Sequence, residues 1–125
     1  MSQTFAQLVA AGSITTTELS ANVASGIAKA WVNFNGTGTV AIRASYNVSS
    51  ITDNNVGDYT VNFTTPLADA NYSAVATAGN TAIAPTDTIR GFVTRAFLSA
   101  SLRIIHCRTD GVASDVEIAS VAIFR

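Results

Sequence analysis

The side chains that could carry out chemistry are few in this chain of 125 residues, and they form no recognisable catalytic set. The chain contains one histidine and one cysteine, His106 and Cys107, which are adjacent. Neighbouring residues of a strand point to opposite faces, so these two cannot share one ion, and two ligands are too few for a structural metal site. A single cysteine also excludes an internal disulfide. We therefore predict no metal and no cofactor, and we expect Cys107 to be a small buried hydrophobic residue.

Two hydrolytic arrangements can be tested against the sequence. A Ser-His-Asp site would have to use His106, which stands among aliphatic residues in a chain without a nucleophile elbow, so a hydrogen-bonded structural histidine is expected instead. Carboxylate pairs such as Asp53 with Asp58, or Asp115 with Glu117, could cleave a glycosidic bond if the fold brought them together. Turn and capping roles explain these acids more simply, and we predict that the protein is not an enzyme.

Charge gives little reason to bind a polyanion. Charged residues make up 12% of the chain and the formal net charge is −1, so nucleic acid is not an expected partner. Basic residues do gather late in the chain, but acidic residues lie among them, which favours ion pairs over a phosphate site. From this region we take Arg90, Arg95 and Asp110 as candidate binding residues.

Aromatic side chains are also scarce, at 8% of the chain. Trp31, Tyr46 and Tyr72 could stack on sugar rings, as aromatic residues do in carbohydrate sites. Because so few aromatic residues are available to fill a core, core packing is the expected role of Trp31.

A β-hairpin is the clearest element that the sequence predicts. In residues 58–64 Tyr59, Val61 and Phe63 alternate with polar residues, which is the two-residue period of a half-buried strand. Asp, Asn and Gly in residues 53–57 favour a turn before it, and Pro66 ends the strand because proline lacks the N–H that a ladder uses.

The other segments complete an all-β pattern. Turn-rich stretches separate further strand-like segments. These segments are residues 30–34, 39–52, 71–78, 88–108 and 115–124. Short strands at this spacing predict an antiparallel sandwich or a jelly-roll-like module.

The N-terminal residues follow a different period. A capping-box pattern at Thr15 and Glu18 precedes apolar residues at four-residue steps, which predicts a short helical segment. We therefore divide the chain into a helical segment over residues 1–28 and a β-sandwich module over residues 29–125.

The composition favours association between copies of the chain. Hydrophobic residues make up 48% of the sequence, and a monomer of this size with so few charges would leave apolar surface exposed. The segments "RIIHC" and "VEIASVAIF" carry apolar side chains on both faces, which fits a sheet covered on both sides. We expect a homo-oligomer. No apolar run approaches the roughly 20 residues of a membrane span, so no membrane insertion is expected.

Residues 29–78 contain consecutive sequence segments that resemble a known module. These are the opening "KAWVNFNGTGT", the hairpin "ITDNNVGDYTVNFT" and the "ADANY" that follows it. They closely resemble a recurring module of tail-fibre and tail-spike-like proteins of bacteriophages that infect aquatic bacteria. The preceding "GSITTTELSANV" looks like segments that join fibre shafts to terminal domains. The resemblance covers about half of the chain and does not extend to the residues from Arg90 onward.

The resemblance implies a virion protein, assembled in the host cytoplasm and carried on the tail or particle surface. It implies a trimeric module in which residues 1–28 serve as an attachment or trimer-stem segment and bind other virion proteins. Its outer loops would touch a host surface glycan or protein. We expect those contacts on residues 53–56, 82–88 or 109–114. A decoration or connector protein of tail, neck or capsid without a host ligand is the main alternative, and a polysaccharide depolymerase is a second one.

Overall fold

The computed structural model describes residues 26–81 and 90–125. The helical segment expected over residues 1–28 therefore lies almost wholly outside the described residues, and the contact loop expected over residues 82–88 lies outside them altogether.

Eight strands make up the described chain. They are β1 (Ala28–Asn35), β2 (Ala41–Tyr46), β3 (Val48–Asn55), β4 (Asp58–Phe63), β5 (Ser73–Gly79), β6 (Arg90–Phe97), β7 (Ser101–Arg108) and β8 (Ile118–Phe124). Most of these segments alternate between buried and exposed residues, as expected of strands with one face against a core.

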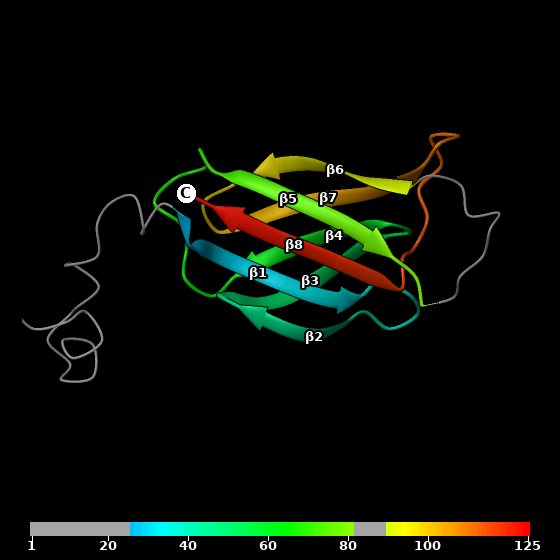
Figure 1. Ribbon diagram of the computed structural model, residues 1–125, viewed down its shortest axis with the longest axis horizontal. Coiled ribbons are helices and arrows are strands. Elements are labelled where there is room, and N and C mark those ends of the chain that lie inside the picture. Colours follow the sequence, from blue (N-terminus) through cyan, green and yellow to red (C-terminus); the bar gives the residue numbers. More distant parts are fainter. Residues whose placement is uncertain (1–25, 82–89) are drawn as a thin grey trace, which may run out of the picture.

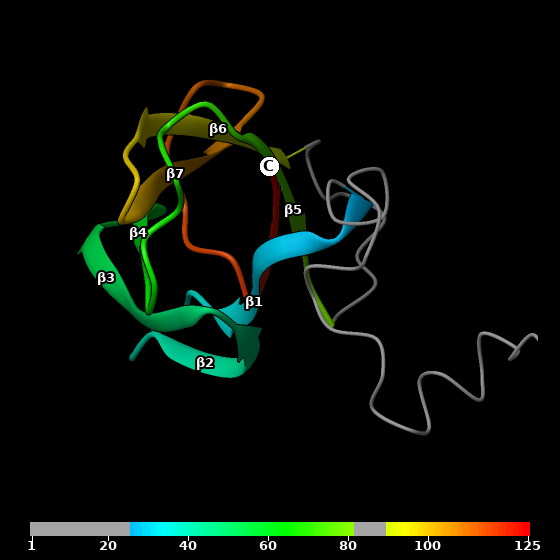
Figure 2. The ribbon, with the colours of Figure 1, turned by 90° about the vertical axis from the view of Figure 1, so that its left-hand side faces the viewer.

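The strands form two four-stranded sheets that pack face to face, which confirms the predicted β-sandwich. Sheet A has the order β2-β1-β8-β5 and sheet B the order β3-β4-β7-β6, and every neighbouring pair is antiparallel. Sheet A lies in front in Figure 1, and Figure 2 shows the two layers from the end. The edge strands β2 and β3 contact each other on one side of the sandwich, and β5 and β6 do so on the other.

The core lies between the inner faces of the two sheets. Sheet A contributes alternate residues of β1 and β8, and sheet B contributes alternate residues of β4 and β7. Phe34 of β1 meets Tyr59 of β4 edge to face, with ring centroids 5.2 Å apart. Tyr59, Val61 and Phe63 are buried, as their strand pattern predicts, and Val116, in the loop before β8, is buried as well. Ile118 and Phe124 are only half-buried, because their alternation places them on the outer face of β8.

The segment expected as one strand over residues 39–52 is in fact two strands in different sheets. The break falls at Asn47, whose φ of 54° lies in the left-handed region that asparagine tolerates better than most residues. Its side-chain amide donates to the carbonyl oxygens of Lys29 and Thr65, at 3.1 Å each, and its side-chain oxygen accepts from the Thr65 N–H at 2.8 Å. These bonds hold the corner where the chain passes from sheet A to sheet B.

Residues 88–108 also differ from the single long segment expected of them. They include a hairpin, β6–β7, closed by reciprocal backbone bonds between Leu98 and Ser101 of 3.0 and 3.4 Å. A β-bulge at Ala96, with a φ of 43°, lets Arg95 point outward while Phe97 packs against the core. The apolar residues continue through this turn, so their periodicity does not mark the reversal.

The β3–β4 hairpin is confirmed, with a tighter turn than predicted. Both strands extend through most of the expected turn region, and only Val56 and Gly57 connect them. Gly57 has a φ of 66°, which glycine adopts readily, and it packs against the backbone of Ser114. The hairpin tip is therefore docked on the loop between β7 and β8.

Candidate functional site

Arg95, one of the residues singled out in the sequence, lies exposed on the outer face of sheet B. Its strand partner across β7 is Arg103, so two guanidinium groups lie on neighbouring strands of one face. Arg103 is tied to the nearly buried Asp58, its Nε donating to Oδ1 at 2.8 Å and its Nη2 to Oδ2. The hydrogen bonds from Arg103 lower the pKa of the Asp58 carboxyl, and a bond from Asn54 adds to this against the opposing effect of burial.

Arg90 and Asp110 lie at a different place. Arg90 is the first residue of β6 and pairs with Arg108 along the ladder. Asp110 forms an ion pair with Arg108 at 3.3 Å and accepts the Val112 N–H at 3.0 Å, so it closes its own turn. Five residues of strand, or roughly 17 Å, separate Arg90 from Arg95. The structure does not bring the three candidates together, and their role in binding stays a prediction.

Amide and hydroxyl side chains cover the part of the outer face of sheet B that β3 and β4 form. Asn54 donates to Thr60 at 2.9 Å. Asn62 donates to Ser50 at 3.1 Å and to Thr52 at 2.9 Å. These cross-strand bonds satisfy the polar groups within the sheet and give the face a fixed, nearly neutral surface.

The single histidine has no access to solvent. His106 is fully buried, and its ring packs on Phe92 with centroids 5.2 Å apart. Its Nδ1 lies 2.7 Å from the Ser114 carbonyl oxygen, which makes Nδ1 the protonated donor, and the Ser114 hydroxyl lies 3.2 Å from the same nitrogen. A serine nucleophile would need the other ring nitrogen, Nε2, which is buried and has no partner among the described residues. This geometry matches the expected structural histidine. Cys107, on the opposite face, is only half-buried rather than buried.

Asp115 and Glu117, one of the acid pairs considered for glycoside cleavage, are engaged in hydrogen bonds that hold neighbouring loops. Asp115 accepts the Gly57 N–H at 2.7 Å and the Tyr59 hydroxyl at 3.2 Å. Burial and the nearby Asp115 carboxylate raise the pKa of that hydroxyl. Glu117 accepts from the hydroxyl and the N–H of Thr81. Within residues 26–81 and 90–125, no three His, Cys, Asp or Glu side chains cluster as metal ligands would.

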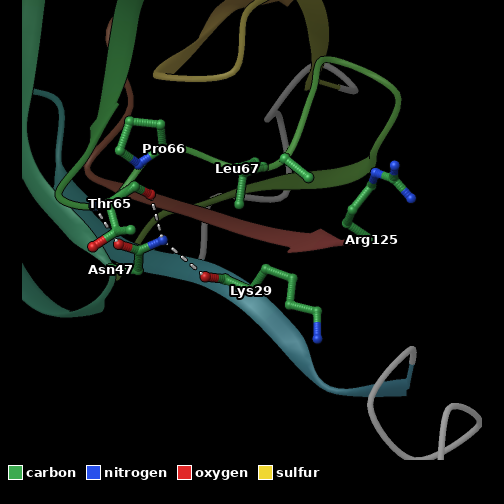
Figure 3. A pocket seen from close by; sticks show the side chains of 7 residues that line it. Lys29, Asn47, Thr65, Pro66, Leu67 and Arg125 are labelled. Carbon is green, nitrogen blue, oxygen red and sulfur yellow. Dashed lines mark hydrogen bonds between the residues drawn. The ribbon is translucent and has the colours of Figure 1, made fainter.

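A shallow pocket of about 420 Å³ opens at the end of the sandwich where β1 begins and β8 ends (Figure 3). Pro66 and Leu67 line it on one side, and the Lys29 and Arg125 side chains lie at its rim. Arg125 is held by Asp69 through bonds of 2.9 and 2.6 Å, and this pairing lowers the pKa of the Asp69 carboxyl. The polar atoms of Asn47 are already used by the backbone. The pocket thus combines an apolar wall with a cation, Arg125, that its ion pair partly neutralises.

Trp31 contradicts the expected core role. It is 40% exposed on the outer face of sheet A, and its partner on β2, Tyr46, is 58% exposed. The reason is visible in the local pattern, because Ala30, Val32 and Phe34 occupy the inner face of β1 and leave Trp31 on the face that it shares with Asn33. The strict alternation in "AWVNF" could have predicted that Trp31 faces outward. The prediction from the scarcity of aromatic residues was wrong, because it placed Trp31 in the core.

Tyr72, the third aromatic residue considered for sugar stacking, is buried. It packs against Phe63 and Phe97, and its hydroxyl donates to the Leu98 and Ser101 carbonyl oxygens. It therefore belongs to the core.

Comparisons with known proteins found no similar protein. No protein-family model matches the chain, and neither the curated proteins nor the solved structures include one that is significantly similar to it. Among the described residues, no helix has the length and apolar character needed to cross a membrane.

Proposed function

We propose that this chain is a surface module of a bacteriophage virion, on a tail fibre or its tip, that attaches to the host by noncovalent contact. The observation that carries the proposal is the resemblance of residues 29–78 to tail-fibre modules. In the fold those residues run from β1 to β5 and supply the β3–β4 hairpin and most of sheet A.

The chemistry of the described surface supports a binding role over a catalytic one. The histidine is sealed in the core, and Asp58 and Asp115 are engaged with their own chain. What the surface offers instead is a rigid sheet with exposed aromatic and aliphatic side chains, which is typical of recognition surfaces.

The proposed assembly is a homotrimer joined to other virion proteins through residues 1–28. Three weak sites on one rigid body gain effective concentration from their linkage, so modest affinity at each site suffices on a repetitive cell surface. The low content of charged residues, 12%, leaves apolar surface that contact between copies would cover.

Binding of the labelled full-length protein to cells tests this function. The proposal expects binding to cells susceptible to the phage and none to resistant derivatives. Binding to purified virions or empty particles alone would overturn it in favour of a decoration or connector protein. Release of reducing ends from host polysaccharide, abolished by Asp115→Asn or Glu117→Gln in folded protein, would instead establish a depolymerase.

A further inference from the structure

We infer that the outer face of sheet A carries a binding platform for a neutral polysaccharide, centred on Trp31 and Tyr46. The inference rests on the proposed host-binding function and adds the site and the class of ligand. Figure 1 is viewed toward this face, with β5, β8 and β1 in front.

Strand register aligns four side chains in one row across the whole sheet. Trp31 pairs with Tyr46 on one side and with Ala122 on the other, and Ala122 pairs with Val75. Paired residues of neighbouring strands share a face, so Tyr46, Trp31, Ala122 and Val75 form a continuous apolar row. Val75, at the far end, is 57% exposed. We call these four residues the aromatic row.

The size of the row fits a sugar chain. Three inter-strand spacings of about 4.8 Å make it roughly 14 Å long, enough for a few sugar rings in file. Aromatic rings present flat apolar faces, which suit the C–H faces of sugars, and their rigidity limits the entropy lost on binding.

Hydrogen-bonding side chains border the row on one side. The next row on the same face contains Asn33, Ser120 and Thr77, which are aligned by the same register. Asn33 donates to the Ser120 hydroxyl at 2.9 Å, which holds both side chains in place beside the rings. Amide and hydroxyl groups next to an aromatic surface can pair with sugar hydroxyls at the edge of a stacked ring.

The face selects a neutral ligand. Neither the aromatic row nor the row of Asn33, Ser120 and Thr77 contains a charged residue. Lys29 of β1 and Arg43 of β2 belong to the same sheet but to neither row, and the guanidinium groups of Arg95 and Arg103 lie on the other sheet.

A second copy of the chain fits this face less well. The row is one residue wide, so its apolar area is about 14 Å by 7 Å, or on the order of 100 Å². A stable interface buries roughly 450 Å² of non-polar surface per partner, a little over half of its roughly 800 Å². Ile118 and Phe124, both half-buried on the outer face of β8, add apolar area outside the row.

Trp31 is the only tryptophan in the chain, so its fluorescence reports directly on the proposed site. Polysaccharide is extracted from susceptible cells, separated into neutral and acidic fractions by anion exchange, and titrated into the full-length protein. We expect the neutral fraction to change the Trp31 emission. Calorimetry with the same fraction should show about a tenfold loss of affinity for both Trp31→Ala and Tyr46→Ala.

Val93→Ala is the matched control, because Val93 is an equally exposed aliphatic residue on the outer face of sheet B. It should bind like the parent protein. Trp31→Phe keeps a ring and should retain most of the affinity, which separates loss of stacking from loss of folding. Circular dichroism checks that each variant is folded.

Three outcomes would overturn the inference. One is an unchanged affinity in Trp31→Ala and Tyr46→Ala, and another is binding of the acidic fraction alone. The third is self-association that Trp31→Ala abolishes without any polysaccharide binding, which would assign the face to a second copy. If the protein binds susceptible cells but the variants bind equally well, the platform fails while the proposed function stands. If the protein binds no cells, the proposed function fails.

Discussion

At the scale of single residues, the ion pair of Asp58 and Arg103 joins β4 to β7 through two hydrogen bonds. The Asp58 side chain is nearly buried at 12% exposure, whereas the Arg103 side chain is 45% exposed. Solvent therefore screens the pair from one side, and its contribution to stability is about 1 kcal/mol rather than the larger value of a buried pair. The ion pair also holds the guanidinium group of Arg103 in place beside the exposed Arg95, its partner on the neighbouring strand.

Asp58→Asn should lower the free energy of unfolding by about 1 kcal/mol at pH 7. The pKa of Asp58 is lowered in the folded state, so its stabilising contribution is present above the unfolded pKa of about 3.9 and is lost as pH falls through the folded pKa. Urea unfolding of both proteins should therefore show a difference that is full at pH 6 to 7 and shrinks below about pH 4. Asp53→Asn, at an exposed position on the same hairpin, should change stability by less than about 0.5 kcal/mol. A pH-independent difference would contradict the role given to the Asp58 carboxylate.

Ala96 carries local backbone strain. Its φ of 43° is costly for a residue with a Cβ, by roughly 1 to 2 kcal/mol. The cost persists because the extra residue in β6 keeps Arg95 outside and Phe97 against the core.

Ala96→Gly should therefore raise the free energy of unfolding by about 0.5 to 1 kcal/mol, since relief of strain exceeds the added flexibility of the unfolded chain. Thermal and urea denaturation measure the change. Ala44→Gly, in the exposed edge strand β2, is the comparison and should lower stability by about 0.5 to 1 kcal/mol. Equal destabilisation by both variants would show that Ala96 is not strained.

At the scale of elements, the tip of the β3–β4 hairpin is locked to the loop between β7 and β8. The Gly57 N–H donates to Asp115 at 2.7 Å, and the Gly57 carbonyl oxygen accepts from the His106 N–H at 2.8 Å. A Cβ at Gly57 would lie 2.6 Å from the Ser114 carbonyl oxygen, with backbone atoms that cannot rotate away. These contacts join the tip of the β3–β4 hairpin to the end of β7 and to the loop that leads from sheet B to sheet A.

Gly57→Ala and Gly38→Ala form a matched pair, because both glycines have positive φ and only Gly57 has neighbours within 4 Å of the added methyl group. Gly38→Ala should cost about 1 kcal/mol for its backbone conformation alone. Gly57→Ala should cost at least about 2 kcal/mol more, because the loop must also move. Denaturant midpoints measure both. Similar costs for the two variants would mean that the hairpin tip is not held by the loop.

At the scale of the whole molecule, the two outer faces of the sandwich differ in chemistry. The outer face of sheet B carries amide and hydroxyl side chains that are hydrogen-bonded across strands, together with the Asp58–Arg103 pair. The outer face of sheet A carries the aromatic row beside uncharged polar residues. The proposed platform requires the sheet A face to remain open, so contacts between copies must use other surfaces.

Sedimentation equilibrium of the full chain at micromolar concentration should give three times the chain mass of 12.9 kDa. Trp31→Ala should sediment as the parent protein does, because the proposed platform requires the proposed trimer contacts to lie on other surfaces. A monomer would contradict the prediction drawn from surface composition. A trimer that dissociates in Trp31→Ala would place the sheet A face in the interface.

The alternation of apolar and polar residues in the sequence was enough to predict several strands of the sandwich. The two-residue period of "DYTVNF" set the buried face of β4, and the Asn- and Gly-rich stretch before it marked the hairpin. These are local signals, because a strand shows its buried face and its turns within a few residues of sequence.

Tertiary structure alone decided how the chain divides between the sheets and where the exposed aromatic residues meet. The corner at Asn47 depends on bonds to Lys29 and Thr65, each 18 residues away, so no local pattern marks it. Trp31 and Val75 share a row only because β8 lies between their strands. Pairing between strands that are distant in sequence arises only when the sheet forms. The proposed site on sheet A depends on this pairing, so the sequence alone could not locate it.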